Sequence, residues 1–177
     1  MVRSVASPRR ILSAIGRLFR PSAAPTPSAP TPARPGAEPG RSGATATVQV
    51  DPRRLGAIRT SYVPSTDGDA DPGEIVWTWV PFEEADGRGK DRPVLVVASE
   101  SAGTVLAVAL TSQEHPGRPE YVPVGAGSWD GRHRPSYARV DRVYRLHQGG
   151  MRREAAALDR RAFDAVRASL RQRYGWG

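Results

Sequence analysis

Residues 87–98 read GRGKDRPVLVVA, and they place a basic loop directly before a short apolar run. The β-branched and apolar residues of VLVVA are typical of a buried strand. Pro93 disfavours helical backbone angles at the residue before it and favours an extended conformation there. We therefore expect Arg92 to lie at the entrance of a buried strand.

Four further segments between residues 73 and 146 have the alternation or the apolar content of strands. They are GEIVWTWVPF (73–82), GTVLAVAL (103–110), EYVPV (120–124) and SYARVDRVYRL (136–146). Strands at such short intervals predict a mainly β fold, either a small barrel or a twisted sheet. In the first of them Trp77 and Trp79 share one face, which is expected either to form barrel wall or to stack on bases.

The last part of the sequence predicts a helix that packs on this sheet. Asp159 is a suitable N-cap, and Leu158 and Phe163 have the spacing of a hydrophobic staple. An apolar stripe follows at helical spacing and consists of Phe163, Val166, Leu170 and Tyr174. The expected fold is therefore a small β barrel with a C-terminal helix.

Composition limits the classes of function. The chain has 177 residues, 38% of them hydrophobic, and no run of about 18 apolar residues, so we expect a soluble chain with one modest core. It has no cysteine, which excludes disulfides, thiolate metal ligands and a cysteine nucleophile. The net charge of +8 comes from residues 1–60, where ten arginines stand against Glu38 and Asp51, whereas residues 61–177 are neutral. Any contact of the C-terminal part with RNA therefore needs a local basic cluster.

Residues 1–70 are expected to lie outside the barrel. Residues 1–20 are a basic amphipathic segment. It predicts either a helix over 8–20 that is suited to an anionic membrane surface or a partner protein, or a frayed tail, because one short helix is marginal alone. Residues 21–70 are rich in proline and alanine and predict an extended, mostly disordered linker. The folded domain is then 71–177.

The segment DGDADPGE, residues 67–74, has the alternate aspartates of a calcium loop at Asp67, Asp69 and Asp71. An EF-hand loop also requires glycine at its sixth position and glutamate at its twelfth, and these positions hold Pro72 and Thr78. We therefore expect a solvated turn here, with no metal ion and no other cofactor.

Loop length sets the register of the second and third predicted strands. If residues 93–99 and 104–110 form a hairpin around ESAG, Arg92 faces Thr111 across the two strands. Directly opposed residues have Cβ atoms about 4.5–5.5 Å apart. A guanidinium and a hydroxyl at that separation can bind one anionic oxygen together, provided that no bulge shifts the register.

These segments, with the final LDRRAFDAV helix and in this order over residues 72–175, resemble the successive motifs of the MazF/PemK (Kid) toxins of bacterial type II toxin-antitoxin systems. The resemblance implies an SH3-like barrel of the CcdB/PemK type, normally a homodimer, with a cognate antitoxin as partner. It also implies metal-independent cleavage of single-stranded RNA, such as mRNA, by transesterification to 2′,3′-cyclic phosphate ends. The location it implies is cytoplasmic, with residues 8–20 suited to the inner face of the membrane.

The resemblance also implies the site. The family's catalytic arginine falls on Arg92, before the motif proline, and its catalytic threonine or serine falls on Thr111. Four further residues are expected to bind substrate because they adjoin Thr111 or lie in the loop that the family uses as a lid: Ser112, Gln113, Arg88 and Lys90.

Two questions stay open in the sequence. The lid loop also carries Glu83, Glu84 and Asp86, which repel RNA and offer contacts to an inhibitor. No residue is assigned as general base, and His115 is expected to be solvated. A function of another class also remains, namely a non-catalytic SH3-like module that binds nucleic acid or protein through the same groove.

Overall fold

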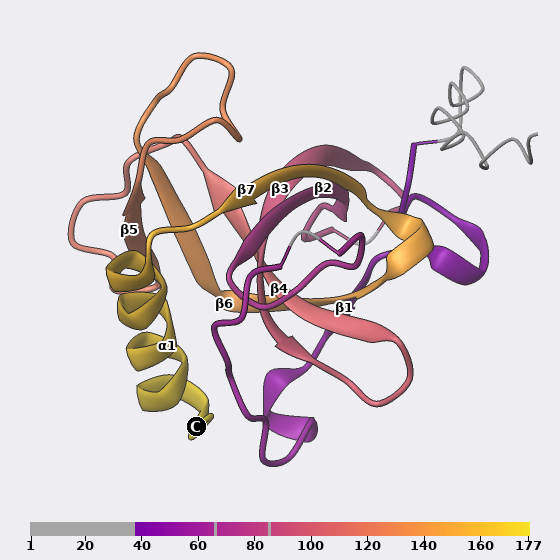
Figure 1. Ribbon diagram of the computed structural model, residues 1–177, viewed down its shortest axis with the longest axis horizontal. Coiled ribbons are helices and arrows are strands. Elements are labelled where there is room, and N and C mark those ends of the chain that lie inside the picture. The colour runs from indigo at the N-terminus through magenta and orange to yellow at the C-terminus, as the bar shows by residue number, and fades with distance from the viewer. Residues whose placement is uncertain (1–37, 66, 85) are drawn as a thin grey trace, which may run out of the picture. The chain divides into compact units, whose positions relative to one another are not determined.

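The computed structural model describes residues 38–65, 67–84 and 86–177, and the predictions for residues 1–37 lie outside this part of the chain. The described residues form one antiparallel sheet of seven strands and one α-helix (Figure 1). The elements are β1 (Val48–Val50), β2 (Glu74–Pro81), β3 (Gly89–Ser99), β4 (Thr104–Thr111), β5 (Tyr121–Gly125), β6 (Ser136–His147), β7 (Arg152–Ala157) and α1 (Arg160–Tyr174). The predicted mainly β fold with a C-terminal helix is confirmed. No helix of the described part is long and apolar enough to span a membrane.

The strand order is β1-β6-β4-β3-β2-β7, with β5 paired to β6. The segment around β1 connects β6 with β2, which lie on opposite sides of the central β4 and β3 in this order. Val48 pairs with Arg145 of β6, and the carbonyl of Pro39 accepts a hydrogen bond of 3.0 Å from the Trp79 N–H of β2. Residues 39–50 therefore bridge from β6 to β2 and help to close the sheet into a barrel.

Buried hydroxyl groups hold this bridging segment in place. The Thr78 hydroxyl donates to the Gly150 carbonyl over 2.7 Å, and the Thr47 and Thr78 hydroxyl oxygens lie 2.6 Å apart. Because the only Thr78 hydroxyl proton is used, Thr47 is the donor in that second bond. Gly40 packs against both threonines, and a Cβ on it would lie 2.2 Å from Thr78 Oγ1.

Residues 38–65 therefore correct part of the prediction of a disordered linker over 21–70. The reason is a change of composition, since this stretch contains enough apolar side chains to bury against the barrel. Those that pack on the core are Val50, Leu55, Ile58 and Tyr62. The Tyr62 hydroxyl also donates to the Leu158 carbonyl over 2.8 Å.

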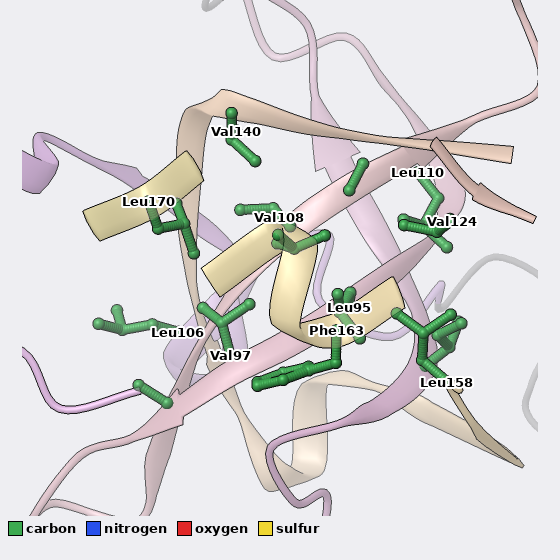
Figure 2. Close-up of a cluster of buried hydrophobic side chains, with 14 of the residues drawn as sticks. Leu95, Val97, Leu106, Val108, Leu110, Val124, Val140, Leu158, Phe163 and Leu170 are labelled. Atoms are coloured by element: carbon green, nitrogen blue, oxygen red, sulfur yellow. The ribbon is translucent and has the colours of Figure 1, made fainter. Parts of the chain in front are cut away.

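Strands β3 and β4 are buried on both faces, which explains why their sequences are continuously apolar. Figure 2 shows one face, where Leu95, Val97 and Val108 pack with Phe163 and Leu170 of α1. The alternate residues point to a second cluster, which contains Val94, Val96, Val105, Ala107, Ala109 and Tyr144. The central hairpin therefore has no solvated face.

Helix α1 lies beside β5 and β6 (Figure 1) and begins at the cap that the sequence predicts. The Asp159 carboxylate accepts hydrogen bonds from the backbone N–H groups of Arg161 and Ala162, at 2.9 and 3.4 Å. At the other end Gly175 has φ of +72°, and its N–H donates to the Arg171 carbonyl. The predicted N-cap is therefore confirmed.

Shortening the protein tests the role of the bridging segment. A chain that begins at Asp71 should fold but unfold at lower denaturant than one that begins at Glu38, because it lacks Thr47, Tyr62 and β1. The expected loss in free energy of unfolding is roughly 3 kcal/mol or more, measured by urea denaturation with circular dichroism. Equal stability of the two chains would show that the barrel does not depend on this segment.

Candidate functional site

The hairpin of β3 and β4 has the predicted register at one end. Val94 pairs with Ala109 and Val96 with Ala107, as predicted, but Ala98 pairs with Leu106. A bulge between Val96 and Ala98 adds one residue to β3 and shifts the turn end of the hairpin by one. At the other end the register is unshifted, and if it is continued past Val94 and Ala109 it places Arg92 opposite Thr111.

Arg92 lies within β3 and not at its entrance, which corrects the sequence prediction. The strand begins at Gly89, because Lys90, Asp91 and Arg92 already pair with β2, the last of them with Thr78. Pairing of β3 with β4 starts only at Val94. Arg92 is therefore paired with β2 on one side, whereas on its other side the pairing with β4 has ended. Its partly exposed side chain lies at the resulting opening of the sheet.

A first cleft of about 420 Å³ lies at this opening. Five of the six predicted site residues line it: Lys90, Arg92, Thr111, Ser112 and Gln113. The Thr111 hydroxyl oxygen accepts a hydrogen bond of 3.1 Å from the Gln113 N–H, so its own proton can be donated to a ligand. Trp77 also lines this cleft, so it contributes to a cleft wall as well as to β2.

The loop between β5 and β6 forms a wall of the first cleft that the sequence analysis missed. It contributes Trp129, Asp130, Gly131 and Arg134. Trp129 is buried, and its indole N–H donates to Ser136 Oγ over 3.2 Å. The ring lies so close to Gly127 that a Cβ there would be 2.0 Å from it. A tryptophan between glycines, GSWDG, was the signal available in the sequence.

Ion pairs distinguish the cations of the first cleft. Arg134 is bound to Asp130 over 2.7 Å, and Asp91 is paired with Arg152 of β7. Within the described residues, the side chains of Lys90 and Arg92 make no hydrogen bond and no ion pair. These two cations are therefore available to an anion that enters the cleft.

A second cleft of about 380 Å³ adjoins the first, and Arg92 lines both. Arg88 lies here and not in the first cleft, and its guanidinium is bound to Asp86 over 2.6 Å. Arg139 and Arg142 of β6 face Glu83 of the β2–β3 loop, at 2.6 and 3.7 Å. The cations of the second cleft are thus largely neutralised by the chain's own carboxylates.

Three ionisable groups near Arg92 have shifted pKa values. The hydrogen bond from Arg134 holds the pKa of the Asp130 carboxyl below its ordinary value. Burial lowers the pKa of Arg139, but its hydrogen bonds to Asp141 and Glu83 outweigh burial and the pKa is raised. Burial also raises the pKa of the Tyr144 hydroxyl, against the charges of Arg142, Arg139 and Arg92. All three groups keep their usual charge at neutral pH.

Other candidates of the sequence analysis lie outside the two clefts. His115 stacks on Tyr121 in a separate groove. Asp67 accepts a hydrogen bond from the Asp69 N–H, which is typical of the turn that was expected. In the part of the chain that the structure describes, no three His, Cys, Asp or Glu side chains are grouped so that they could hold a metal ion.

The fold and these clefts can be compared with known proteins. Residues 71–173 match the model of the PemK-like, MazF-like toxins of type II toxin-antitoxin systems, and the chain belongs to this family. Among curated proteins none matches the chain.

Solved structures of similar fold include MazE-MazF and MazF of Deinococcus radiodurans and an endoribonuclease from a mycobacterial species. The first is 21% identical and covers 62% of this chain and 98% of its own, with a TM-score of 0.46. The second is 23% identical, with coverage of 60% and 97% and a TM-score of 0.47. The third is 17% identical, with coverage of 61% and 94% and a TM-score of 0.44.

The contact of Trp129 with Gly127 can be tested by two matched substitutions. Gly127→Ala should displace the indole ring and lower the free energy of unfolding by about 1–3 kcal/mol, because the added methyl group overlaps the ring. Gly131→Ala is the control, since a Cβ at Gly131 meets no atom within 4 Å. Thermal unfolding of both variants checks this. Equal melting temperatures would show that Trp129 is not fixed by Gly127.

Proposed function

We propose that this chain is the toxin of a type II toxin-antitoxin system and an endoribonuclease that cleaves single-stranded RNA. The observation that carries the proposal is that Arg92, a cation without an acidic partner in the described residues, lines one cleft with Thr111. Membership of the PemK-like, MazF-like toxin family supports it. The RNA phosphate is the anion that this cleft would bind.

The reaction proposed is transesterification. The RNA 2′-hydroxyl attacks the adjacent phosphorus, the 5′-oxygen leaves, and the products end in a 2′,3′-cyclic phosphate and a 5′-hydroxyl. This step needs the 2′-hydroxyl deprotonated, the pentavalent oxyanion stabilised and the leaving oxygen protonated.

Arg92 suits the stabilisation of the oxyanion. Its planar guanidinium matches two phosphate oxygens, whereas arginine side chains stay charged in proteins and are therefore poor proton carriers. Pairing with β2 holds its backbone, so little backbone freedom is lost when a phosphate binds. The Thr111 hydroxyl donates to the same phosphate, and Lys90 adds positive charge at the cleft.

The general base is left unassigned. The carboxylates that line the first cleft are Asp91 and Asp130, and each is paired with an arginine. The hydrogen bond from Arg134 lowers the pKa of Asp130 and makes it a weaker base. The Asp91 carboxylate is occupied by Arg152. Neither aspartate is therefore a convincing base in this arrangement.

We propose an acidic antitoxin segment as the second ligand of these clefts. The loop that carries Glu83 already pairs with Arg139 and Arg142, so carboxylates of a partner can take its place on the same arginines. Arg88 is proposed to contact RNA or this partner only after it is released from Asp86. A homodimer and a cytoplasmic location complete the proposal.

Arg92→Ala is the main test of this function. Loss of one oxyanion donor should lower RNA cleavage by about 10²-fold or more while the melting temperature is kept. Thr111→Ala should cost less, because its hydroxyl assists. Arg161→Ala is the matched control, since this exposed arginine lies at the start of α1, away from the clefts. Equal cleavage by the wild type and Arg92→Ala would leave the non-catalytic binding module as the better explanation.

The role of metal ions is tested separately. The purified protein should cleave a long single-stranded RNA of mixed sequence in the presence of EDTA at an unchanged rate, because Arg92 is proposed to supply the positive charge. The products should carry 2′,3′-cyclic phosphate and 5′-hydroxyl ends, which end-labelling and mass spectrometry detect. Cleavage that stops in EDTA and returns with magnesium would contradict this mechanism.

A further inference from the structure

Strand pairing places aromatic side chains beside Thr111. Thr111 of β4 pairs with Tyr137 of β6, and in the neighbouring row Arg139 of β6 pairs with Tyr121 of β5. Directly paired residues of antiparallel strands have their side chains on the same face of the sheet. Tyr137 is therefore next to Thr111 on one face of the sheet. Tyr121 lies on the same face on the adjacent strand β5, opposite Arg139, which is two residues from Tyr137 on β6.

A histidine completes this group, which we call the aromatic platform (His115, Tyr121 and Tyr137). The rings of His115 and Tyr121 are stacked, with centroids 3.9 Å apart and planes at 23°. The three rings line a groove of about 400 Å³ between Tyr137 and the loop that follows β4. The pairing of Tyr137 with Thr111 thus places the platform beside a residue of the first cleft.

The rings of the aromatic platform differ from the aromatic side chains of the core. They are only partly buried, and within the described residues none of the three makes a side-chain hydrogen bond. Tyr62 and Tyr174, which pack on the core, donate instead to the carbonyls of Leu158 and Val140. Since His115 covers one face of Tyr121, the platform offers a ligand the other face of His115 and the polar edges of the two tyrosines.

The charges around the platform indicate what kind of ligand fits. The guanidinium groups of Arg118 and Arg139 lie 5.6 and 5.7 Å from the Tyr121 ring centroid. Arg118 is bound to Glu120 over 2.7 Å, and Arg139 is bound to Asp141 and Glu83. Because these cations are already neutralised, the groove offers stacking surface and not a strong site for a phosphate.

We propose that the aromatic platform binds a nucleobase of single-stranded RNA, next to the phosphate held by Arg92 and Thr111. The inference rests on the proposed ribonuclease function and extends it to the nucleotide beside the cleavage point. The base stacks on His115 and lengthens the existing His115–Tyr121 stack, with Tyr137 at its edge. Stacking accepts any base, so the platform adds affinity for unpaired strands and does not set the cleavage sequence.

The experiment measures binding apart from cleavage. A fluorescent single-stranded RNA of mixed sequence with 2′-fluoro sugars has no attacking hydroxyl, and its affinity for the full chain is measured by anisotropy. An abasic strand of the same length is the second probe. His115→Ala should weaken binding of the first probe by about 5- to 100-fold and leave the second unchanged. His115→Phe should restore binding, and His147→Ala, at the far end of β6, is the control.

Several outcomes would overturn the proposal. These are no binding of the 2′-fluoro strand to the wild type, equal binding by His115→Ala, or an equal loss for the abasic strand. Melting temperatures that match the wild type exclude unfolding as the cause of a loss. Cleavage of unmodified RNA is measured in parallel. Binding that depends on His115 without any cleavage would contradict the proposed reaction but not the platform. Cleavage together with binding that does not depend on His115 would contradict the platform but not the reaction.

Discussion

The pairing of Val94 with Ala109 is the contact on which the arrangement of the site depends. It is the last pair between β3 and β4, and it leaves Arg92 and Thr111 just beyond it. Because successive side chains of a strand point to opposite faces, a slip of either strand by one residue would send its own site residue to the face opposite that of the other. The bulge near Val97 lies on the turn side of this pair, so the change of register does not reach the site.

Burial of both faces of the β3–β4 hairpin stabilises this pairing. One face of the hairpin packs on α1 and the other on the barrel interior, so a slip would exchange two clusters of different shape. The interior face has small residues at Ala107 and Ala109, whereas the face toward α1 has Leu106, Val108 and Leu110. Close packing of each set therefore opposes a slip of one residue.

Distribution of charge, not its amount, makes the first cleft suitable for an anion. Residues 61–177 carry as many acidic as basic side chains, and many arginines near the site are paired with carboxylates. Arg92 and Lys90 differ because within the described residues no carboxylate reaches them. Two unpaired cations in a polar cleft can attract a phosphate even though residues 61–177 have no net charge.

The sequence by itself determined the elements that depend on nearby residues. Five strands, the capped helix and the register beside Arg92 follow from alternation, capping residues and hairpin length. The sequence did not predict β1 and β7. RREAAA at 152–157 contains residues that favour helices, and it becomes a strand because the edge of β2 offers it hydrogen-bonding partners.

Much of the lining of the first cleft was also predictable, because Lys90 and Arg92 lie in the first residues of β3 and the residues from Thr111 to Gln113 lie at the end of β4, the next strand in the sequence. The wall around Trp129 and the stack of His115 on Tyr121 were not, since each comes from a loop whose position is set by distant contacts. The same holds for residues 38–65, which are ordered through bonds such as that of Thr47 to Thr78. Local patterns act over a few residues, whereas edge pairing, cleft walls and the closing of the barrel depend on surfaces that exist only once the chain has folded.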